Sequence, residues 1–217
     1  MLSPSDAGAI IAAARDEALG ACDGAAAPQE ESLTDDAGDD RRFSQTGTLR
    51  DGTPVTIRVM RPDDRERIVR AFNKLDADTI YTRFFSFRKE IPARTLDRIA
   101  DIDFDHLAGL VATLGSGGDE TVIAAATYVV APADDGARVA EVAFTVEEDY
   151  QGQGLAKRLL AALITLARRH GIARFQAEVL AGNAPMLAVF QRSGQPMRRR
   201  IEGGVVQVTM DLAPQAG

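Results

Sequence analysis

The sequence predicts an α/β fold of the α+β kind, with a mixed, mostly antiparallel sheet of about seven strands flanked by helices. Two observations predict it. Strand-like runs over residues 106–114, 120–130 and 138–146 are joined by short turns that contain glycine and aspartate, which indicates an antiparallel meander. A strand, a glycine-containing loop, a helix and another strand then occupy residues 139–180, and such a β-α-β passage makes its two strands parallel.

Composition divides the chain into an acidic tail over residues 1–40 and a folded domain over residues 41–217. The 217 residues are 45% hydrophobic, which is enough to bury a substantial core. The net charge of −7 is unevenly spread, because residues 1–40 carry ten acidic side chains and one arginine. The remaining residues carry 22 acidic and 24 basic side chains, so we expect a nearly neutral domain.

The acidic tail is expected to consist of a helix and a linker. Residues 7–19 are rich in alanine and follow Ser5 and Asp6, either of which can cap a helix. This helix either docks on the domain or a partner, or frays in solution. Residues 24–40 are too polar to bury themselves, so the sequence predicts a disordered acidic linker.

The folded domain is predicted to begin with a hairpin and helices. Asp51-Gly52 is a turn signal between residues 47–50 and a strand over 55–59. Pro62 then begins a helix, and two further helical regions are expected over residues 79–87 and 92–102. The apolar stripe of the first helix consists of Ile68, Val69, Phe72 and Leu75.

The carboxyl half is predicted to contain one long helix and three strands. Residues 155–170 have apolar side chains at roughly helical spacing. A strand over residues 173–180 follows, parallel to the strand before the loop. A final hairpin joins residues 197–202 to residues 205–212 and completes the sheet.

The segment Asp149-Tyr-Gln-Gly-Gln-Gly-Leu-Ala156 has the composition of an anion-binding loop. Its two glycines let the main chain approach an anion closely, and the first turn of the following helix directs N–H groups at it. A tight turn without a ligand also uses glycine. A P-loop is excluded because Gly154 is followed by leucine rather than lysine, and the missing third glycine argues against a dinucleotide fingerprint.

The pattern Gln/Arg-x-x-Gly-x-Gly/Ala, carried by Gln151, Gly154 and Ala156, resembles the acetyl-CoA loop of the GNAT superfamily of N-acyltransferases. The resemblance extends from about residue 53 to residue 212. Residues 56–64 and 78–86 resemble the start of the acetyltransferase domain of bacterial Pat-type protein lysine acetyltransferases. The resemblance implies a GNAT N-acetyltransferase domain over residues 41–217 that uses acetyl-CoA as its co-substrate.

The resemblance also implies which residues bind this co-substrate. Asn183 begins a helix that resembles the one closing the family's CoA site, where it either caps the helix or bonds to pantetheine. Phe190 replaces a tyrosine that protonates the leaving thiolate in many relatives, so it can pack against pantetheine but cannot donate a proton. If the strand before the loop parts from its neighbour, the main chain of Phe144, Thr145 and Val146 can hold pantetheine. The main-chain amides expected to bind the pyrophosphate belong to Gln151, Gly152, Gln153, Gly154, Leu155 and Ala156.

Glu141 is the candidate general base. A lysine amine with a pKa of about 10.4 is only about 0.04% neutral at pH 7, a deficit of about 4.6 kcal/mol. Strand alternation places Glu141 on one face with Ala143 and Thr145, and apolar neighbours should raise the pKa of its carboxyl group. The Pat-like resemblance implies a glutamate base at this place, whereas the alternative is an ion pair with Arg138. Direct transfer is expected, because the one cysteine, Cys22, lies in the tail.

Three functions remain open on the sequence. The first is acetylation of protein lysines, the second is acetylation of a small amine, and the third is a catalytically silent acyl-CoA-binding module regulated by the acidic tail. Residues 81–85 are either core or the lining of an acceptor entrance, with Tyr81, Arg83, Phe84 and Phe85 as the side chains concerned. A homo-oligomer is also left open.

The sequence gives no sign of a nucleic-acid partner, a membrane span, a secretion signal or a metal site. The chain shows no nucleic-acid signature, no basic n-region of a signal peptide and no apolar run near twenty residues. The single cysteine leaves no thiolate metal site, and the isolated His106 and His170 are expected to be structural. We therefore expect a cytoplasmic protein without a metal, a membrane partner or a nucleic-acid partner.

Overall fold

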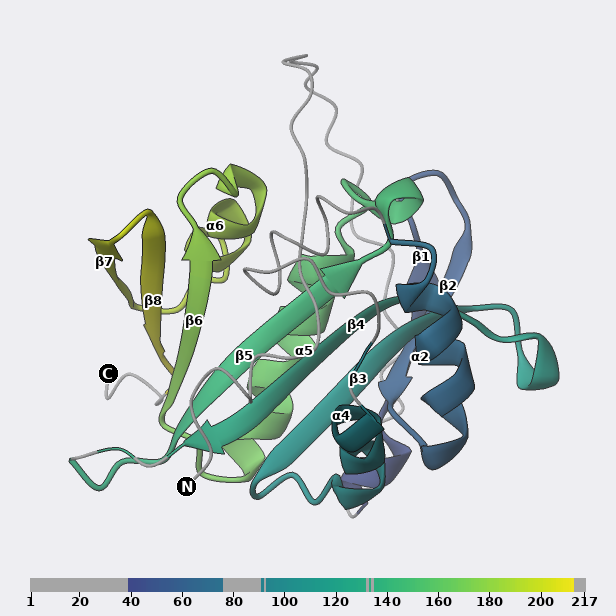
Figure 1. Ribbon diagram of the computed structural model, residues 1–217, viewed down its shortest axis with the longest axis horizontal. Coiled ribbons are helices and arrows are strands. Elements are labelled where there is room, and N and C mark those ends of the chain that lie inside the picture. The colour runs from purple at the N-terminus through teal and green to yellow at the C-terminus, as the bar shows by residue number, and fades with distance from the viewer. Residues whose placement is uncertain (1–38, 76–90, 92, 132, 134, 213–217) are drawn as a thin grey trace.

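The structure is a computed structural model that describes residues 39–75, 91, 93–131, 133 and 135–212. The described part contains one eight-stranded sheet in the order β1-β2-β3-β4-β5-β6-β8-β7 (Figure 1). The strands are antiparallel except for β5 and β6, so the predicted mixed sheet is confirmed with one strand more than expected. Their bounds are β1 Ser44–Thr48, β2 Pro54–Val59, β3 Leu107–Leu114, β4 Thr121–Ala131, β5 Val139–Val146, β6 Arg174–Leu180, β7 Met197–Glu202 and β8 Val205–Asp211.

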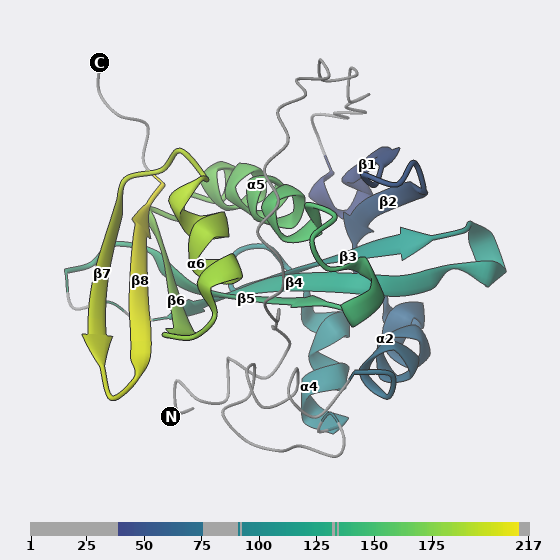
Figure 2. The same cartoon turned by 90° about the horizontal axis from the view of Figure 1, so that it is seen from above.

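Helices cover the sheet from both sides (Figure 2). On one side lie α5 (Leu155–Arg169) and α6 (Ala184–Gln191), and on the other lie α2 (Arg65–Phe72) and α4 (Ala93–Asp97). The apolar stripe of α5 is fully buried against the sheet because leucines recur at helical spacing, as at Leu159, Leu163 and Leu166. Short 3₁₀ helices connect the elements, with bounds η1 Asp40–Arg42, η2 Pro62–Asp64, η3 Arg98–Asp101, η4 Gly117–Asp119 and η5 Glu148–Tyr150.

The predicted elements recur with shifted boundaries. The first hairpin strand begins earlier than expected, at Ser44, and the region predicted as a helix over 92–102 contains α4 and η3. In α2, Ile68 and Phe72 are buried, whereas Val69 is half-buried. The helical region expected over 79–87 and the side chains of residues 81–85 lie outside the described residues. So does the acidic tail, apart from its last two residues.

A buried network of ion pairs connects β2 to the start of α2 and to the turn before β4. Arg58 on β2 is 2% exposed and Asp64, just before α2, is 0% exposed. The Arg58 guanidinium donates to both Asp64 oxygens at 2.6 and 2.7 Å, and it also bonds to Glu120 Oε2 at 2.6 Å. One cation therefore joins β2, the start of α2 and the turn before β4.

A second charged cluster ties the start of the domain to the end of α5. Asp40 accepts hydrogen bonds from Arg169 and from His170, both at 2.8 Å. The other ring nitrogen of His170 lies 3.3 Å from Asp105 Oδ1, and the ring stacks on Phe104. His106 bonds to Asp103 at 2.7 Å. These contacts assign structural positions to both histidines, as expected.

Asp40→Asn is expected to lower the free energy of unfolding at pH 7 by about 1–2 kcal/mol, because two charge-assisted hydrogen bonds are lost. Burial opposes ionisation of Asp40, but the bonds from Arg169 and His170 outweigh it and hold its pKa below the ordinary 3.8. A lowered folded pKa stabilises the fold above the unfolded pKa, and this contribution is lost as pH falls through the folded pKa. In urea titrations the deficit of the variant should therefore shrink below about pH 4.

The matched control is Glu66→Gln, since Glu66 is 88% exposed in its pair with Arg70. This change should leave stability within about 0.5 kcal/mol of wild type. An Asp40→Asn deficit that stays constant down to pH 2.5 would contradict an ionic origin.

Candidate active site

The strands β5 and β6 part from each other partway along their length. Their parallel pairing covers only Val139–Glu141 of β5 and Arg174–Gln176 of β6, although both strands continue beyond. Figure 1 shows the two strands diverging toward the end of the sheet at which α6 and the loop before α5 lie. The sheet therefore contains a wedge-shaped gap with Glu141 at its closed end.

Main-chain groups of β5 face this gap. Glu147 N donates to Ile123 O at 2.9 Å, and an antiparallel ladder forms its bonds at every second residue. Thr145 and Ala143 therefore bond to β4, whereas the main-chain groups of Phe144 and Val146 point away from β4. No strand pairs with Phe144 or Val146 on that side within the described residues. Of the three residues whose main chain was expected to hold pantetheine, Phe144 and Val146 therefore face the gap, whereas the main chain of Thr145 does not, because it is used by the ladder with β4.

Glu141 is half-buried. It shares a face of β5 with Thr145 and Glu147, which line a pocket with residues of α2, so it lies on the side of the sheet opposite α5. Its cross-strand neighbours are Val129 on β4 and Gln176 on β6. The alternative partner considered for it, Arg138, instead pairs with Asp105 at 3.4 Å. Glu141 does not line the large cavity described below, whose apolar wall is Phe144 on the other face.

The loop before α5 is shaped by two glycines. Gly152 and Gly154 have φ angles of +71° and +87°, a left-handed conformation that residues with a Cβ atom rarely adopt. Gly154 is the residue before the first turn of α5, so the N–H groups of that turn open onto the loop. The Gln151 side chain donates to Val146 O at 3.3 Å and ties the loop to the end of β5.

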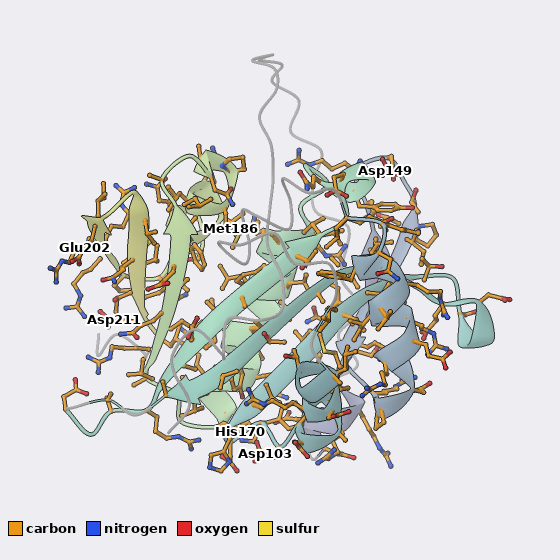
Figure 3. All side chains as sticks on the ribbon, in the orientation of Figure 1. Asp103, Asp149, His170, Met186, Glu202 and Asp211 are labelled. Carbon is orange, nitrogen blue, oxygen red and sulfur yellow. The ribbon has the colours of Figure 1, made fainter. Side chains whose placement is uncertain are left out.

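A cavity of about 290 Å³ joins the gap, the loop and α6. Most of the cofactor-binding residues expected from sequence line it, namely Phe144, Thr145, Val146, Gln151, Gly152, Gly154, Leu155, Ala156 and Asn183. The side chain of Thr145 lies on the opposite face of β5 from that of Phe144, where Thr145 also lines a pocket beside α2. In Figure 3, Asp149 in the loop and Met186 on α6 stand on the two sides of the gap, whereas His170 and Asp103 lie at the far end of the sheet.

Two residues expected to bind the cofactor are not among those that line the cavity. The side chain of Gln153 is directed to the hairpin, where its oxygen accepts a hydrogen bond from Arg50 N at 3.0 Å, so only its main-chain amide is left for a ligand. Phe190 is 1% exposed and packs edge-on against Phe144, with ring centroids 5.9 Å apart, so it supports the cavity wall from behind. Both positions result from tertiary packing that the motif alone does not reveal.

Asn183 has the capping role that was one of its two expected roles. Its side-chain oxygen accepts from Met186 N at 3.1 Å at the start of α6, and the residue is 4% exposed. Since the oxygen is used by the helix, only the side-chain nitrogen remains for a ligand in the cavity.

Sequence reasoning missed the basic side chains of the cavity. Arg50, Lys157 and Arg192 line it and come from the β1–β2 turn, from α5 and from the end of α6. In the sequence, Lys157 is one of several basic residues near the polar side of its helix and Arg192 is one of several arginines near the end of the chain, so neither is distinguished from a solvated surface residue. Arg50 carried no signal, because it lies about 100 residues before the loop. The described residues contain no cluster of three or more His, Cys, Asp or Glu side chains suited to a metal ion, and none of their helices combines the length and apolarity of a membrane span.

The comparisons with known proteins agree with this geometry. The model of the acetyltransferase (GNAT) family matches residues 75–195. Acetyltransferase Pat of Mycolicibacterium smegmatis is 38% identical over 168 residues, which are 76% of this chain and 48% of the relative. The chain thus spans about half the length of that relative.

Solved structures show the same relationship. The GNAT domain of S. lividans PAT is 36% identical, with a TM-score of 0.69 over 77% of this chain and 96% of that domain. The Salmonella typhimurium protein yncA, solved with its cofactor acetyl-CoA, shares the fold at 19% identity, with a TM-score of 0.58 over 75% of this chain and 96% of its own. The family match covers more than half of the sequence. The chain therefore belongs to the GNAT family of acetyltransferases.

Proposed function

We propose that this acyltransferase is an acetyl-CoA-dependent N-acetyltransferase that modifies lysine side chains of proteins, with Glu141 as the general base. One observation carries the proposal: Glu141 lies where β5 and β6 part, and the anion-binding loop lies at the open end of the same gap. The distance along β5 from Val146 to Glu141 is about 17 Å, enough for an extended pantetheine arm to bring a thioester toward Glu141.

The cavity offers contacts for each part of acetyl-CoA. The pyrophosphate would lie on the main-chain amides of residues 151–156, where two left-handed glycines and a helix N-terminus favour an anion. The pantetheine arm would pair with the main chain of Phe144 and Val146, while the side-chain nitrogen of Asn183 donates to one of its carbonyls. The similarity to yncA, which was solved with acetyl-CoA, supports this choice of co-substrate.

The reaction is a direct transfer from sulfur to nitrogen. Glu141 takes a proton from the ammonium group of the acceptor, directly or through a water molecule, and the neutral amine attacks the thioester carbon. The C–N bond forms, main-chain N–H groups of β5 stabilise the oxyanion, and the C–S bond then breaks. Because Phe190 has no hydroxyl group, the thiolate leaves without a phenolic donor and takes its proton from water or from the attacking amine.

The acceptor side favours a protein. Glu141 begins a cross-strand row on the sheet face away from α5, and this row continues through Gln176, Thr209 and Arg198. Gln176 and Arg198 are exposed, so a surface wide enough for a polypeptide adjoins the base. The resemblance of residues 56–64 and 78–86 to the Pat-type protein lysine acetyltransferases supports a protein acceptor. An acetyltransferase for a small amine and a silent acyl-CoA-binding module are the alternatives.

A panel of folded proteins and small amines tests the acceptor. Radiolabelled acetyl transfer and mass spectrometry should find ε-acetyl-lysine in at least one protein, with much slower transfer to free lysine and polyamines. Turnover of small amines but of no protein would reject protein lysines as the acceptor and support the small-amine acetyltransferase. Tight binding of acetyl-CoA without transfer to any acceptor would support the silent module.

Gly154→Ala is expected to weaken acetyl-CoA binding about tenfold, because a Cβ atom at a φ of +87° costs about 1–2 kcal/mol and displaces the loop amides. Isothermal titration calorimetry measures the change. Gly136→Ala is the control, since Gly136 has a φ of +72° in the turn between β4 and β5, far from the cavity. Gly136→Ala should lower the free energy of unfolding by about as much as Gly154→Ala, yet it should bind acetyl-CoA with wild-type affinity. Equal losses of affinity in both variants would contradict a specific role for the loop.

A further inference from the structure

The turn between β1 and β2 is fastened to the anion-binding loop. Arg50 N, in this turn, donates to the Gln153 side chain at 3.0 Å. Arg158 on α5 donates to Thr48 O at 3.3 Å, and its guanidinium packs so closely on Gly47 that a Cβ atom there would lie 2.3 Å from Nη2. Two contacts from the loop and from α5 therefore hold the hairpin beside the loop.

This docking brings a third cation to the cavity. Lys157 and Arg192 already line it from α5 and α6, and Arg50 lines it from the hairpin. All three side chains belong to exposed residues, and none of them forms an ion pair with a described carboxylate. Most arginines nearby in the sequence are satisfied otherwise, as Arg58 is by two carboxylates. Three cations from separate elements, none paired with a carboxylate in the described part of the chain, thus line the same cavity.

These cations exceed what the pyrophosphate requires. The loop amides and the first turn of α5 already provide donors for that group. A coenzyme A molecule also carries a 3′-phosphate on its ribose, which is largely a dianion at neutral pH and would otherwise add unbalanced charge at the mouth. Arginine binds phosphate through paired N–H donors, whereas an amide loop offers single donors.

We propose that Arg50 binds the 3′-phosphate of coenzyme A, assisted by Arg192, and so makes the enzyme selective for coenzyme A over its 3′-dephospho form. Gln153 acts as a positioning residue in this proposal, because it fixes the main chain of Arg50. The inference rests on the proposed use of acetyl-CoA but concerns a part of the molecule remote from the thioester.

Calorimetry with acetyl-CoA and acetyl-3′-dephospho-CoA tests the proposal on the full chain. The wild-type protein should bind acetyl-CoA at least tenfold more tightly than acetyl-3′-dephospho-CoA. Arg50→Gln should weaken the binding of acetyl-CoA about tenfold and leave the affinity for the dephospho ligand unchanged. Gln153→Ala should weaken the binding of acetyl-CoA by a smaller factor and should also leave the affinity for the dephospho ligand unchanged. Arg199→Gln, which removes an exposed arginine of β7, is the control for net charge and should change neither affinity.

Each other outcome has a definite meaning. If Arg50→Gln weakens both ligands equally, Arg50 contacts the pyrophosphate and the proposal is overturned. If it weakens neither, Arg50 is not a ligand. If the folded wild type binds neither compound, the use of acetyl-CoA itself fails, and this result is distinct from a loss of selectivity.

Discussion

Glu141→Gln should lower kcat/KM for acetyl transfer by about 10²–10⁴-fold while the affinity for acetyl-CoA stays within about twofold of wild type. The amide cannot accept the proton of a lysine ammonium group, so the variant must wait for the small neutral fraction of the amine. The loss should therefore be greatest near pH 7 and should diminish as pH rises toward the pKa of the acceptor, about 10.4. Steady-state acetylation between pH 6.5 and 10 measures it.

Glu178→Gln is the matched control for this experiment. Glu178 is an exposed carboxylate on β6, two residues beyond the cross-strand neighbour of Glu141 and on the same face of the sheet. Glu178→Gln removes one negative charge from the acceptor side of the sheet, as Glu141→Gln does, but it leaves the carboxylate at the closed end of the gap in place. If both variants lose activity equally, the effect is a general electrostatic one, and if Glu141→Gln retains full activity, another group removes the proton.

Arg58→Met should lower the free energy of unfolding by about 3–5 kcal/mol, since it removes both short guanidinium hydrogen bonds from Asp64 and leaves this inaccessible carboxylate only the Arg61 N–H and a longer 3.3 Å contact with Arg67. The methionine preserves most of the side-chain volume, so the loss reports the missing cation rather than a void. Burial opposes ionisation of Asp64, but hydrogen bonds from Arg58 and from the Arg61 N–H, together with the charges of Arg58 and Arg67, keep its pKa below 3.8. Urea-induced unfolding followed by circular dichroism measures the change.

Arg65→Met is the comparison for the buried network. Arg65 pairs with Asp97 at the surface, where the two side chains are 43% and 65% exposed. Arg65→Met should change the free energy of unfolding by less than about 1 kcal/mol. Equal effects of the two substitutions would mean that the Arg58 network contributes no more than a surface pair.

Much of the fold follows from local sequence signals. The strands around the loop, the long helix α5 and the final hairpin lie close to their predicted ranges, because alternation, helical periodicity and Gly203-Gly204 act over a few residues. The strand count differs by one, since the amino-terminal hairpin supplies two complete strands. Boundaries at the hairpin shifted because β1 pairs along Ser44–Thr48 as β2 requires, a register that the turn residues alone do not define.

The site was less accessible to sequence reasoning than the fold. The loop residues belong to one short motif and Asn183 to a second, and the structure gathers most of these residues around one cavity. Gln153 and Phe190 belong to the same motifs, yet long-range packing directs one to the hairpin and the other behind Phe144. Arg50 could not be found at all, since only the docking of two distant segments brings it to the cavity.

The parting of β5 from β6 changes how the co-substrate would be held. Beyond Glu141, the edge of β5 that faces β6 is unpaired within the described residues and so resembles the edge of an unfinished sheet. A pantetheine arm carries amide groups of its own and would occupy that edge as a short guest strand, by the rules of β-augmentation. Such an arm would extend the main-chain ladder across the gap, so that the carrier of the acetyl group becomes, for the duration of binding, part of the protein's secondary structure.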